Sequence, residues 1–286
     1  MRQVDALAVS RSVGEQLGNG PLDGRVLASF EQACNVHLSN GEVLSLVLSA
    51  VGNGPLNIVV EPDAGPLDLL ARDAPVVTSA ETVTVGTFTV SLARATVWEP
   101  RPNWERLRAN QAAIAAHLLE FGARCWRRAV TNGTLLPIEQ STAHGTWQAA
   151  SRARAERGLL TLQRGWAGSM ELVREGAVHL AGLGSGLTPA GDDFLAGMML
   201  RAWLTHPAPV PFCQAVVAGI EGRTTIFSAA LLRAAARGAC SAAWHNLFAA
   251  LTRGEALEAA GTGILRCGAS SGADALTGFL WLDAPL

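Results

Sequence analysis

Three short polar, glycine-rich segments in the second half of the chain contain the residues best suited to chemistry. The first spans residues 183–194 (LGSGLTPAGDDF), the second begins at residue 223 (RTT), and the third spans residues 268–274 (GASSGAD). An apolar run follows each segment, so each is predicted to stand at the start of a helix. A helix start offers unpaired backbone N–H groups and the positive end of the helix dipole, which both favour anions. We therefore expect the three segments to meet at one pocket for a small anionic ligand.

The first segment combines glycines with two adjacent acids. Thr188 followed by Pro189 is typical of an N-cap and a first helical position, which predicts that a helix begins directly after the loop. Asp192 and Asp193 then fall in the first turn, about 100° apart around the helix axis. One of them should face the ligand and the other should orient the loop, and the sequence does not distinguish the two.

The charges and hydroxyl groups of the three segments suit a ligand with an anionic end and an amide end. Arg223 can bind a carboxylate or phosphate as a bidentate fork, whereas the aspartates accept hydrogen bonds from amide or amine groups. The candidate catalytic residues are Asp192, Asp193 and Arg223. The candidate substrate-binding residues are the glycines, the hydroxyl residues and the third acid of the segments: Gly184, Ser185, Gly186, Thr188, Thr224, Thr225, Ser270, Ser271, Gly272 and Asp274.

Two other interpretations of these segments stay open. Acids in a first helical turn complement the helix dipole, so the segments can be purely structural helix caps. Alternatively, Asp192, Asp193 and Asp274 offer the carboxylate oxygens that Mg²⁺ prefers. Because their spacing matches no recognisable metal motif, we predict no resident metal or cofactor and leave Mg²⁺ as the one possible ion.

Composition excludes several classes of function. The chain has 286 residues, a net charge of -2 and 49% hydrophobic residues, which predicts a folded globular protein that binds neither nucleic acid nor a membrane. It contains neither lysine nor tyrosine, so Schiff-base chemistry and a P-loop lysine are excluded. The five cysteines are scattered without a CxxC pair, which favours reduced thiols and a cytoplasmic location. The absence of an HExxH motif disfavours a zinc enzyme, and no serine is interpreted as the nucleophile of a strand-to-helix GxSxG elbow, which disfavours a serine hydrolase.

The periodicity of apolar residues divides the chain near residue 100, at the sequence PRP. After a short opening helix, alternating β-branched runs separated by Asn-Gly turns predict an antiparallel β-sheet or small barrel over residues 1–100. The uncharged stretch 43–60 is broken by GNGP at residues 52–55, which indicates a hairpin rather than a membrane span. From residue 103 the spacing becomes helical: an apolar stripe from residue 104 predicts one long helix that ends at Asn132-Gly133, and a second helix is predicted from about residue 141 to 164. Residues 101–286 are predicted to form an all-helical domain that carries the glycine-rich segments. The predicted fold class is α+β.

At these three segments the sequence resembles the AllH-like family, which contains a subunit of the oxamate carbamoyltransferase of anaerobic allantoin breakdown. The resemblance rests on GLGSGLTPAGDDFLAG (182–197), RTTIFSAALLRAAARG (223–238) and GASSGADALTG (268–278), in order and in spacing. The chain departs from the family at Ser185, where proline is frequent, and at Ala273, where an aromatic residue is common.

The resemblance implies carbamoyl transfer between phosphate and oxamate, with oxamate and carbamoyl phosphate on one side and oxalurate and phosphate on the other. It also implies that other enzyme subunits, or further copies of the chain, are partners. In this interpretation Arg223 and helix amides bind the anionic group, and one aspartate is the candidate base. The alternative is a regulatory or binding subunit that holds a carboxylate-amide ligand without chemistry.

Overall fold

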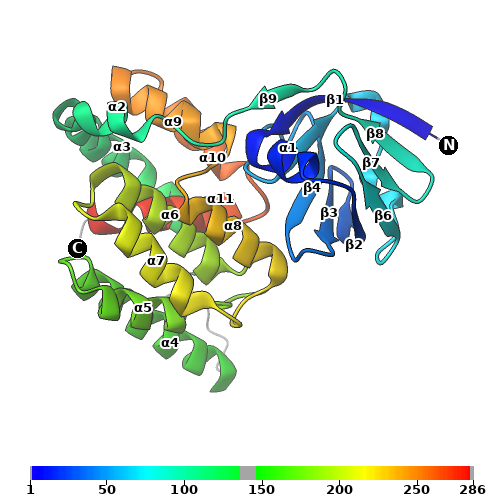
Figure 1. Cartoon of the computed structure of the whole chain (residues 1–286). Helices are drawn as coiled ribbons and strands as arrows, with labels where there is room; N and C mark the ends of the chain where they lie inside the picture. Colours follow the sequence, from blue (N-terminus) through cyan, green and yellow to red (C-terminus); the bar gives the residue numbers. More distant parts are fainter. Residues whose placement is uncertain (1, 136–145, 284–286) are drawn as a thin grey trace. The chain divides into compact units, whose positions relative to one another are not determined.

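The chain divides into two compact units, here called the barrel unit (Met1–Pro100 with Cys240–Ala242) and the helical unit (Arg101–Ala239 with Ala243–Leu286). The computed structural model describes residues 2–135 and 146–283 (Figure 1). The predicted α+β fold class is confirmed, because strands occupy the first part of the chain and helices the rest. No helix among the described residues is long and apolar enough to cross a membrane.

The barrel unit is built from eight strands that close on themselves, with a ninth strand added to the first. Its strands are β1 (Arg2–Ser10), β2 (Leu22–Phe30), β3 (Ala33–Leu38), β4 (Val43–Leu48), β5 (Asn57–Val60), β6 (Pro75–Thr78), β7 (Thr82–Val85), β8 (Phe88–Ser91) and β9 (Thr96–Trp98). Helix α1 (Arg11–Gly18) and two 3-10 turns, η1 (Pro62–Ala64) and η2 (Leu67–Leu69), complete it. Val13 and Leu17 of α1 join the buried apolar cluster that fills the barrel.

Strand β1 closes the barrel because its two halves pair with different strands. Residues 2–5 pair in parallel with β8, while residues 8–10 pair in parallel with β9. Its second half also pairs antiparallel with β5, with a bulge between Ala6 and Ala8. The predicted opening helix, inferred from Leu7, Val13 and Leu17, is therefore wrong at its start, because Leu7 lies in β1 and the helix spans only residues 11–18. Partners 50 to 90 residues away decide this, and local periodicity does not reveal them.

The predicted hairpin over residues 43–60 is also wrong. β4 and β5 are neighbours, but they run parallel, with Ser45 opposite Asn57 and Leu48 opposite Val60. The Gly-Asn-Gly turn does interrupt the stretch, and the chain then returns to start β5 in the same direction as β4. The remaining barrel pairings, β2–β3, β3–β4, β2–β6, β6–β7 and β7–β8, are antiparallel, as predicted for this region.

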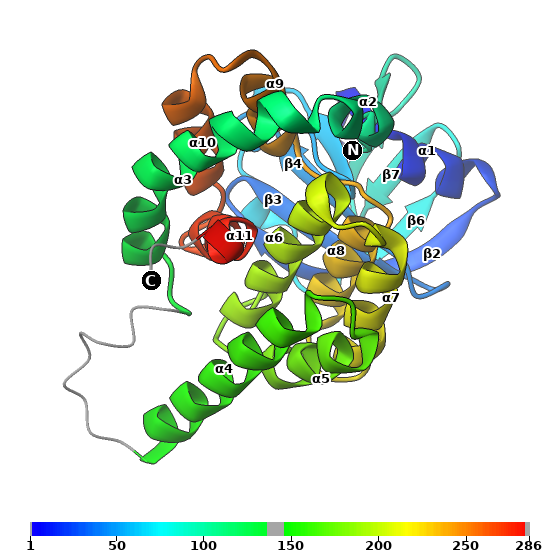
Figure 2. The same cartoon turned by 90° about the vertical axis from the view of Figure 1, so that its left-hand side faces the viewer.

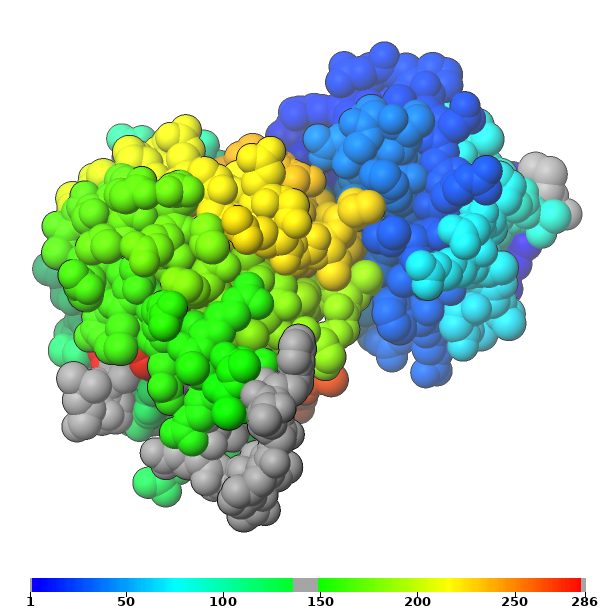
Figure 3. Space-filling view, turned by 90° about the horizontal axis from the view of Figure 1, so that it is seen from below, coloured from blue at the N-terminus to red at the C-terminus, as the bar shows by residue number. Residues whose placement is uncertain are grey.

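The helical unit is organised around α6 (Ala190–Thr205), which is buried on nearly every side. The other helices are α2 (Trp104–Ala109), α3 (Gln111–Asn132), α4 (Thr146–Gly165), α5 (Met170–Leu180), α7 (Pro209–Ile220), α8 (Ile226–Ala236), α9 (Ala242–Arg253), α10 (Leu257–Leu265) and α11 (Ser271–Leu280), with a 3-10 turn η3 (Trp281–Asp283). Helices α2, α5, α7, α8 and α11 all contact α6 (Figure 2). Helices α4 and α5 pack together, and α4 lies on the surface in the space-filling view (Figure 3).

The apolar stripe predicted from residue 104 onward faces the interior of the helical unit. Ile114, Leu118, Phe121 and Cys125 are buried in α3. The helix is interrupted at Asn110, which caps the short α2 and precedes α3, so the predicted single helix is two. The predicted start of the next helix, at residue 141, falls outside the described residues.

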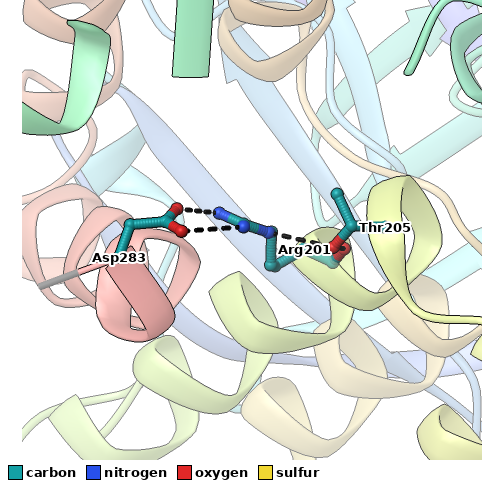
Figure 4. A network of polar contacts seen from close by, with 3 residues as sticks. All are labelled: Arg201, Thr205 and Asp283. Atoms are coloured by element: carbon teal, nitrogen blue, oxygen red, sulfur yellow. Dashed lines mark hydrogen bonds and ion pairs between the residues drawn. The ribbon is translucent and has the colours of Figure 1, made fainter. Parts of the chain in front are cut away.

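A buried ion pair ties the end of the chain to α6. The Arg201 guanidinium bonds both carboxylate oxygens of Asp283 and donates through Nε to Thr205 Oγ1 at 3.0 Å (Figure 4). The side chains of Arg201 and Asp283 are 9% and 18% exposed, so water replaces neither partner easily. This pair fixes η3 beside α6.

We expect Asp283→Ala to destabilise the protein by about 3 kcal/mol or more, because it leaves a buried guanidinium without its counter-charge. Glu120→Ala is the control, since Glu120 and Arg124 form an exposed pair on α3 and its loss costs about 0.5 kcal/mol. Urea unfolding followed by tryptophan fluorescence measures both changes. Equal effects of the two substitutions would contradict this account of the pair.

Candidate functional site

The three glycine-rich segments meet around the start of α6. The Thr188 and Ser271 hydroxyl oxygens lie 2.9 Å apart, which joins the first segment to the third. Thr225 Oγ1 donates to the Leu187 carbonyl at 2.6 Å, which joins the second segment to the first. The structure therefore brings together residues that are up to 83 positions apart in the chain.

Glycines allow the backbones of these segments to approach closely. A Cβ on Gly182 would lie 2.3 Å from the Arg223 carbonyl oxygen, and one on Gly272 would lie 1.9 Å from that of Ile264. Gly182 has a φ of 67°, a conformation that other residues adopt at a cost. At the tip of the loop, Ser185 and Gly186 are exposed, and a Cβ on Gly186 would meet nothing within 4 Å. The base of the loop is tightly packed and its tip is open.

Asp192 is the residue that orients the loops. Its side chain is 1% exposed, and its carboxylate accepts hydrogen bonds from the Gly182 N–H at 2.9 Å, from Ser228 Oγ at 2.7 Å and from the Thr224 hydroxyl. Burial raises the pKa of Asp192, and these three donors act against that rise. Asp192 thus holds the first and second segments together from inside, and both of its oxygens are bonded to the protein.

Asp193 faces the other way, toward the third segment. Burial is the main cause that raises its pKa to about 7, with the Asp274 and Asp192 carboxylates adding to the rise and the Ser271 and Thr188 hydroxyls opposing it. Its Oδ2 atom is buried and has no hydrogen-bond partner among the described residues. A buried carboxylate oxygen without a donor is costly, and a ligand N–H group would satisfy it. Of the two aspartates, Asp193 is therefore the one with capacity to bind.

Asp274 holds the two residues that follow the C-cap of α3. Its Oδ1 accepts the backbone N–H groups of Thr134 and Leu135 at 2.8 and 2.9 Å, and its Oδ2 accepts the Thr134 hydroxyl at 3.1 Å. Ser270 also donates to it, and burial raises its pKa. The sequence predicted a substrate-binding role for Asp274, but its oxygens are occupied by the protein itself.

The sequence predicted free backbone N–H groups at the start of α6, and this prediction is wrong. The helix begins at Ala190 with Pro189 as its N-cap, so Thr188 lies outside the helix and does not cap it. The Gly191 N–H donates to the Leu183 carbonyl at 2.8 Å, and those of Asp192 and Asp193 donate to the Pro189 carbonyl. The loop folds back onto the first turn and uses the donors that an anion would need. By contrast, Thr225 caps α8 as predicted, accepting the Ser228 N–H at 3.0 Å.

Arg223 is exposed beside this cluster. Its backbone carbonyl lies against Gly182, while no hydrogen bond or ion pair holds its guanidinium among residues 2–135 and 146–283. Its guanidinium is therefore available to bind an anion through two parallel N–H groups. Nothing in the structure joins it directly to Asp193.

Several residues of the cluster were missed by sequence reasoning. Ser228 lies on the inner face of α8, three residues after its cap, and Thr134 directly follows the predicted Asn132-Gly133 helix end. Arg154 of α4 donates to the Ala181 carbonyl at 2.7 Å, and its charge acts to lower the pKa of Asp192. Ser228 could have been found from the sequence, because it lies three residues after the Thr225 cap. No local pattern predicts the contact between Arg154 and Ala181.

The acids do not form a metal-binding group. Within the part of the chain that the structure describes, no set of three or more His, Cys, Asp or Glu side chains could hold a metal ion. Asp192 and Asp274 direct their oxygens at protein donors, which leaves Asp193 as the one acid with an unused oxygen. The geometry does not fit Mg²⁺ bound by these three aspartates.

A closed β-barrel unit and a helical unit whose buried acids gather at a glycine-rich helix start define a class of two-unit α+β proteins. The chain belongs to the AllH family: residues 5–97 match the AllH family N-terminal domain, and residues 180–282 match the oxamate carbamoyltransferase subunit AllH. The resemblance inferred from the three motifs is confirmed, and the second match encloses all of them. The family description names AllH as a subunit, which implies that its partners are other enzyme subunits. No solved structure matches the chain significantly.

Proposed function

We propose that this chain supplies an amide-binding and proton-accepting site to an oxamate carbamoyltransferase, which interconverts oxamate plus carbamoyl phosphate and oxalurate plus phosphate. The observation that carries the proposal is the unpaired Oδ2 of Asp193 in a buried cluster at the glycine-rich loop. The membership of the chain in the AllH family supports the choice of reaction.

Asp193 suits the role of general base because its pKa of about 7 is close to neutral pH. In the oxalurate-forming direction, the amide nitrogen of oxamate attacks the carbonyl carbon of carbamoyl phosphate. A C–N bond forms, the C–O bond to phosphate breaks, and one amide proton passes to Asp193. That proton then leaves with the product as hydrogen phosphate, so Asp193 returns to its starting state.

Arg223 is proposed to bind the anionic end of a substrate. Its free guanidinium can form a bidentate pair with a carboxylate or phosphate. The open tip of the loop, with Ser185 and Gly186, leaves room for that group next to the cluster. Further donors for phosphate belong to partner subunits in this proposal, because the first turn of α6 has used most of its own N–H groups.

A second candidate function is a subunit that binds the carboxylate-amide ligand without catalysing the reaction. It is favoured because the N–H groups in the first turn of α6 are already bonded within the protein. An oxyanion site needs donors aimed at the developing charge, and the described cluster contains few. The two candidates differ in what the loss of the Asp193 carboxylate does to turnover.

We expect Asp193→Asn, assembled with its partner subunits, to lower kcat by about 100-fold or more, as for loss of a general base. In the native enzyme, kcat for oxalurate formation should rise with pH until about pH 7 and then level off, since Asp193 must be ionised to accept a proton. The variant should lack this rise. Carbamoyl transfer, measured as phosphate release between pH 5.5 and 8.5, tests this, and an unchanged pH profile with unchanged kcat would instead support the binding subunit.

A stability measurement serves as the control for this variant. Burial raises the pKa of Asp193 above its value in the unfolded chain, so the folded state holds the proton more tightly. The contribution of this carboxyl to stability is therefore present below about pH 4 and lost as the pH rises through about 7. Asp193→Asn removes the penalty of ionisation and should melt higher than the native chain at pH 8, with no gain at pH 4. A variant that melts lower at both pH values is misfolded and unfit for the kinetic comparison.

A further inference from the structure

The helical unit contains a hollow that is lined by none of the three buried aspartates and that the proposed reaction does not use. Its volume is about 880 Å³, and it lies between α7 and α8, which pack side by side (Figure 1). We call this hollow the α7–α8 groove. Its size is within the range of about 300–1,000 Å³ that is typical of small-molecule sites.

The walls of the groove are apolar and come from one face of each helix. On α7 the lining residues Val210, Val217 and Ala218 recur at helical spacing, and Trp203 of α6 contributes from beneath. Ala229 lines the opposite wall on α8. Val210 is 45% exposed, so part of this apolar surface is open to water. Such a surface favours an apolar body in the groove.

Two cations stand on the α8 wall without counter-charges. Arg233 in the last turn of α8 and Arg237, the C-cap residue of that helix, both line the groove and are four residues apart. Neither guanidinium has a hydrogen bond or an ion pair with any residue that the structure describes. Arg233 is half-buried, which makes its lack of a partner unfavourable. Two like charges one turn apart also repel each other, and a bound anion would relieve both costs.

A third cation adds to the positive field. The Arg101 guanidinium lies 5.0 Å from the centroid of the Trp203 ring, over one wall of the groove. One carboxylate, Glu221, is also at the groove, and it forms no ion pair with Arg233 or Arg237. The groove therefore has a net positive charge next to apolar walls.

We propose that the α7–α8 groove binds a small amphipathic organic anion, with a carboxylate or sulfonate on Arg233 and Arg237 and an apolar body against α7 and Trp203. This ligand differs in class from oxamate, oxalurate and carbamoyl phosphate, which have no apolar body to place on these walls. The groove is also distinct from the acid cluster in its residues. It shares helix α8 with that cluster, because Thr225 and Ser228 at the start of the same helix bond Leu187 and Asp192.

The test uses two fluorescent probes of similar shape on the full chain: anilinonaphthalene sulfonate, which is anionic, and phenylnaphthylamine, which is uncharged. We expect the anionic probe to bind with one site, and the double variant Arg233→Gln/Arg237→Gln to weaken it about tenfold or more, since charge-assisted hydrogen bonds are lost. The same variant should change binding of the uncharged probe less than about twofold, because that probe makes no such bonds. Arg253→Gln is the matched control, an exposed arginine at the end of α9 outside the groove.

A second variant tests whether both probes bind inside the groove. Ala218 is exposed on the α7 wall, so Ala218→Trp fills the groove from the surface and should abolish binding of both probes while the melting temperature stays unchanged. The proposal is overturned if the double arginine variant binds the anionic probe as the native chain does, or if Arg253→Gln weakens it equally. It is also overturned if assembly with the partner subunits removes the binding, because the groove would then be a subunit interface. These outcomes are independent of turnover at Asp193.

Discussion

Replacing Gly197 with alanine is expected to prevent the helical unit from folding stably. Gly197 lies in α6 where α11 crosses it, and an added Cβ would lie 1.8 Å from the Ala275 carbonyl oxygen. The contact is with backbone, so no side chain can move away to make room. Gly278 on α11 is in the same position from the other side, 2.0 Å from the Phe194 carbonyl oxygen. The two helices pack backbone to backbone through this pair of glycines.

The expected cost exceeds that of ordinary overpacking, which is about 1–3 kcal/mol, because here the helices themselves must separate. Separation would disturb α6 along its length, including the turn that carries Asp192 and Asp193. We therefore expect Gly197→Ala to lose the cooperative unfolding transition, or to be destabilised by about 4 kcal/mol or more. Urea unfolding followed by tryptophan fluorescence reports on this unit, since seven of the eight tryptophans lie beyond residue 100.

Gly263→Ala is the matched control for this experiment. Gly263 is also a helical glycine, in α10, but an added Cβ would meet nothing within 4 Å. Alanine is the better helix former by about 1 kcal/mol, so this substitution should stabilise the protein slightly. Two identical changes in two helices should thus have opposite signs. If Gly197→Ala proves as harmless as Gly263→Ala, the close crossing of α6 and α11 is wrong.

The second large effect is expected from Asp192→Ala. This change leaves the Gly182 N–H and the hydroxyls of Thr224 and Ser228 without their common acceptor in a buried site. Each unsatisfied buried group costs about 1–3 kcal/mol, and the hydroxyls can recover part of this by rotating. We expect a total loss of about 3–5 kcal/mol, with the first and second segments released from each other.

Two further variants separate this tethering role from a general effect of charge. Asp192→Asn keeps the shape and one acceptor, so it should cost less than Asp192→Ala. Glu175→Ala removes an exposed carboxylate on α5 and should change stability by no more than about 0.5 kcal/mol. The two Asp192 variants should also show faster hydrogen exchange at Gly182, whose N–H loses its acceptor. Unchanged exchange at Gly182 in Asp192→Ala would contradict the tether, whatever the stability change.

Asp192 and Asp193 therefore have predicted effects of different kinds. Loss of the Asp192 carboxylate is expected to lower stability, and any loss of turnover follows from that. Loss of the Asp193 carboxylate is expected to lower turnover while raising stability above pH 7. We therefore predict that these adjacent acids divide into a structural and a functional role according to which neighbouring segment each one faces.

The features that depend on local order could be predicted from residues close together in the chain. The change of apolar period near residue 100, the buried stripe of α3 and the Thr225 cap of α8 are all read from residues a few positions apart, because helix and strand periods are local properties. The three motifs likewise sufficed to recognise the family, since their order and spacing are linear information.

Which of these residues have unpaired polar atoms depends on contacts that form when the chain folds. Asp192 and Asp193 are equivalent in the sequence, and they differ because Gly182, Thr224 and Ser228 surround one while the other keeps a buried, unpaired oxygen. The same holds for Asp274, which Thr134 and Leu135 occupy, and for β1, which becomes a strand through partners distant in the chain. Hydrogen bonding, desolvation and strand pairing depend on groups brought together by folding, and local sequence patterns carry no record of those partners.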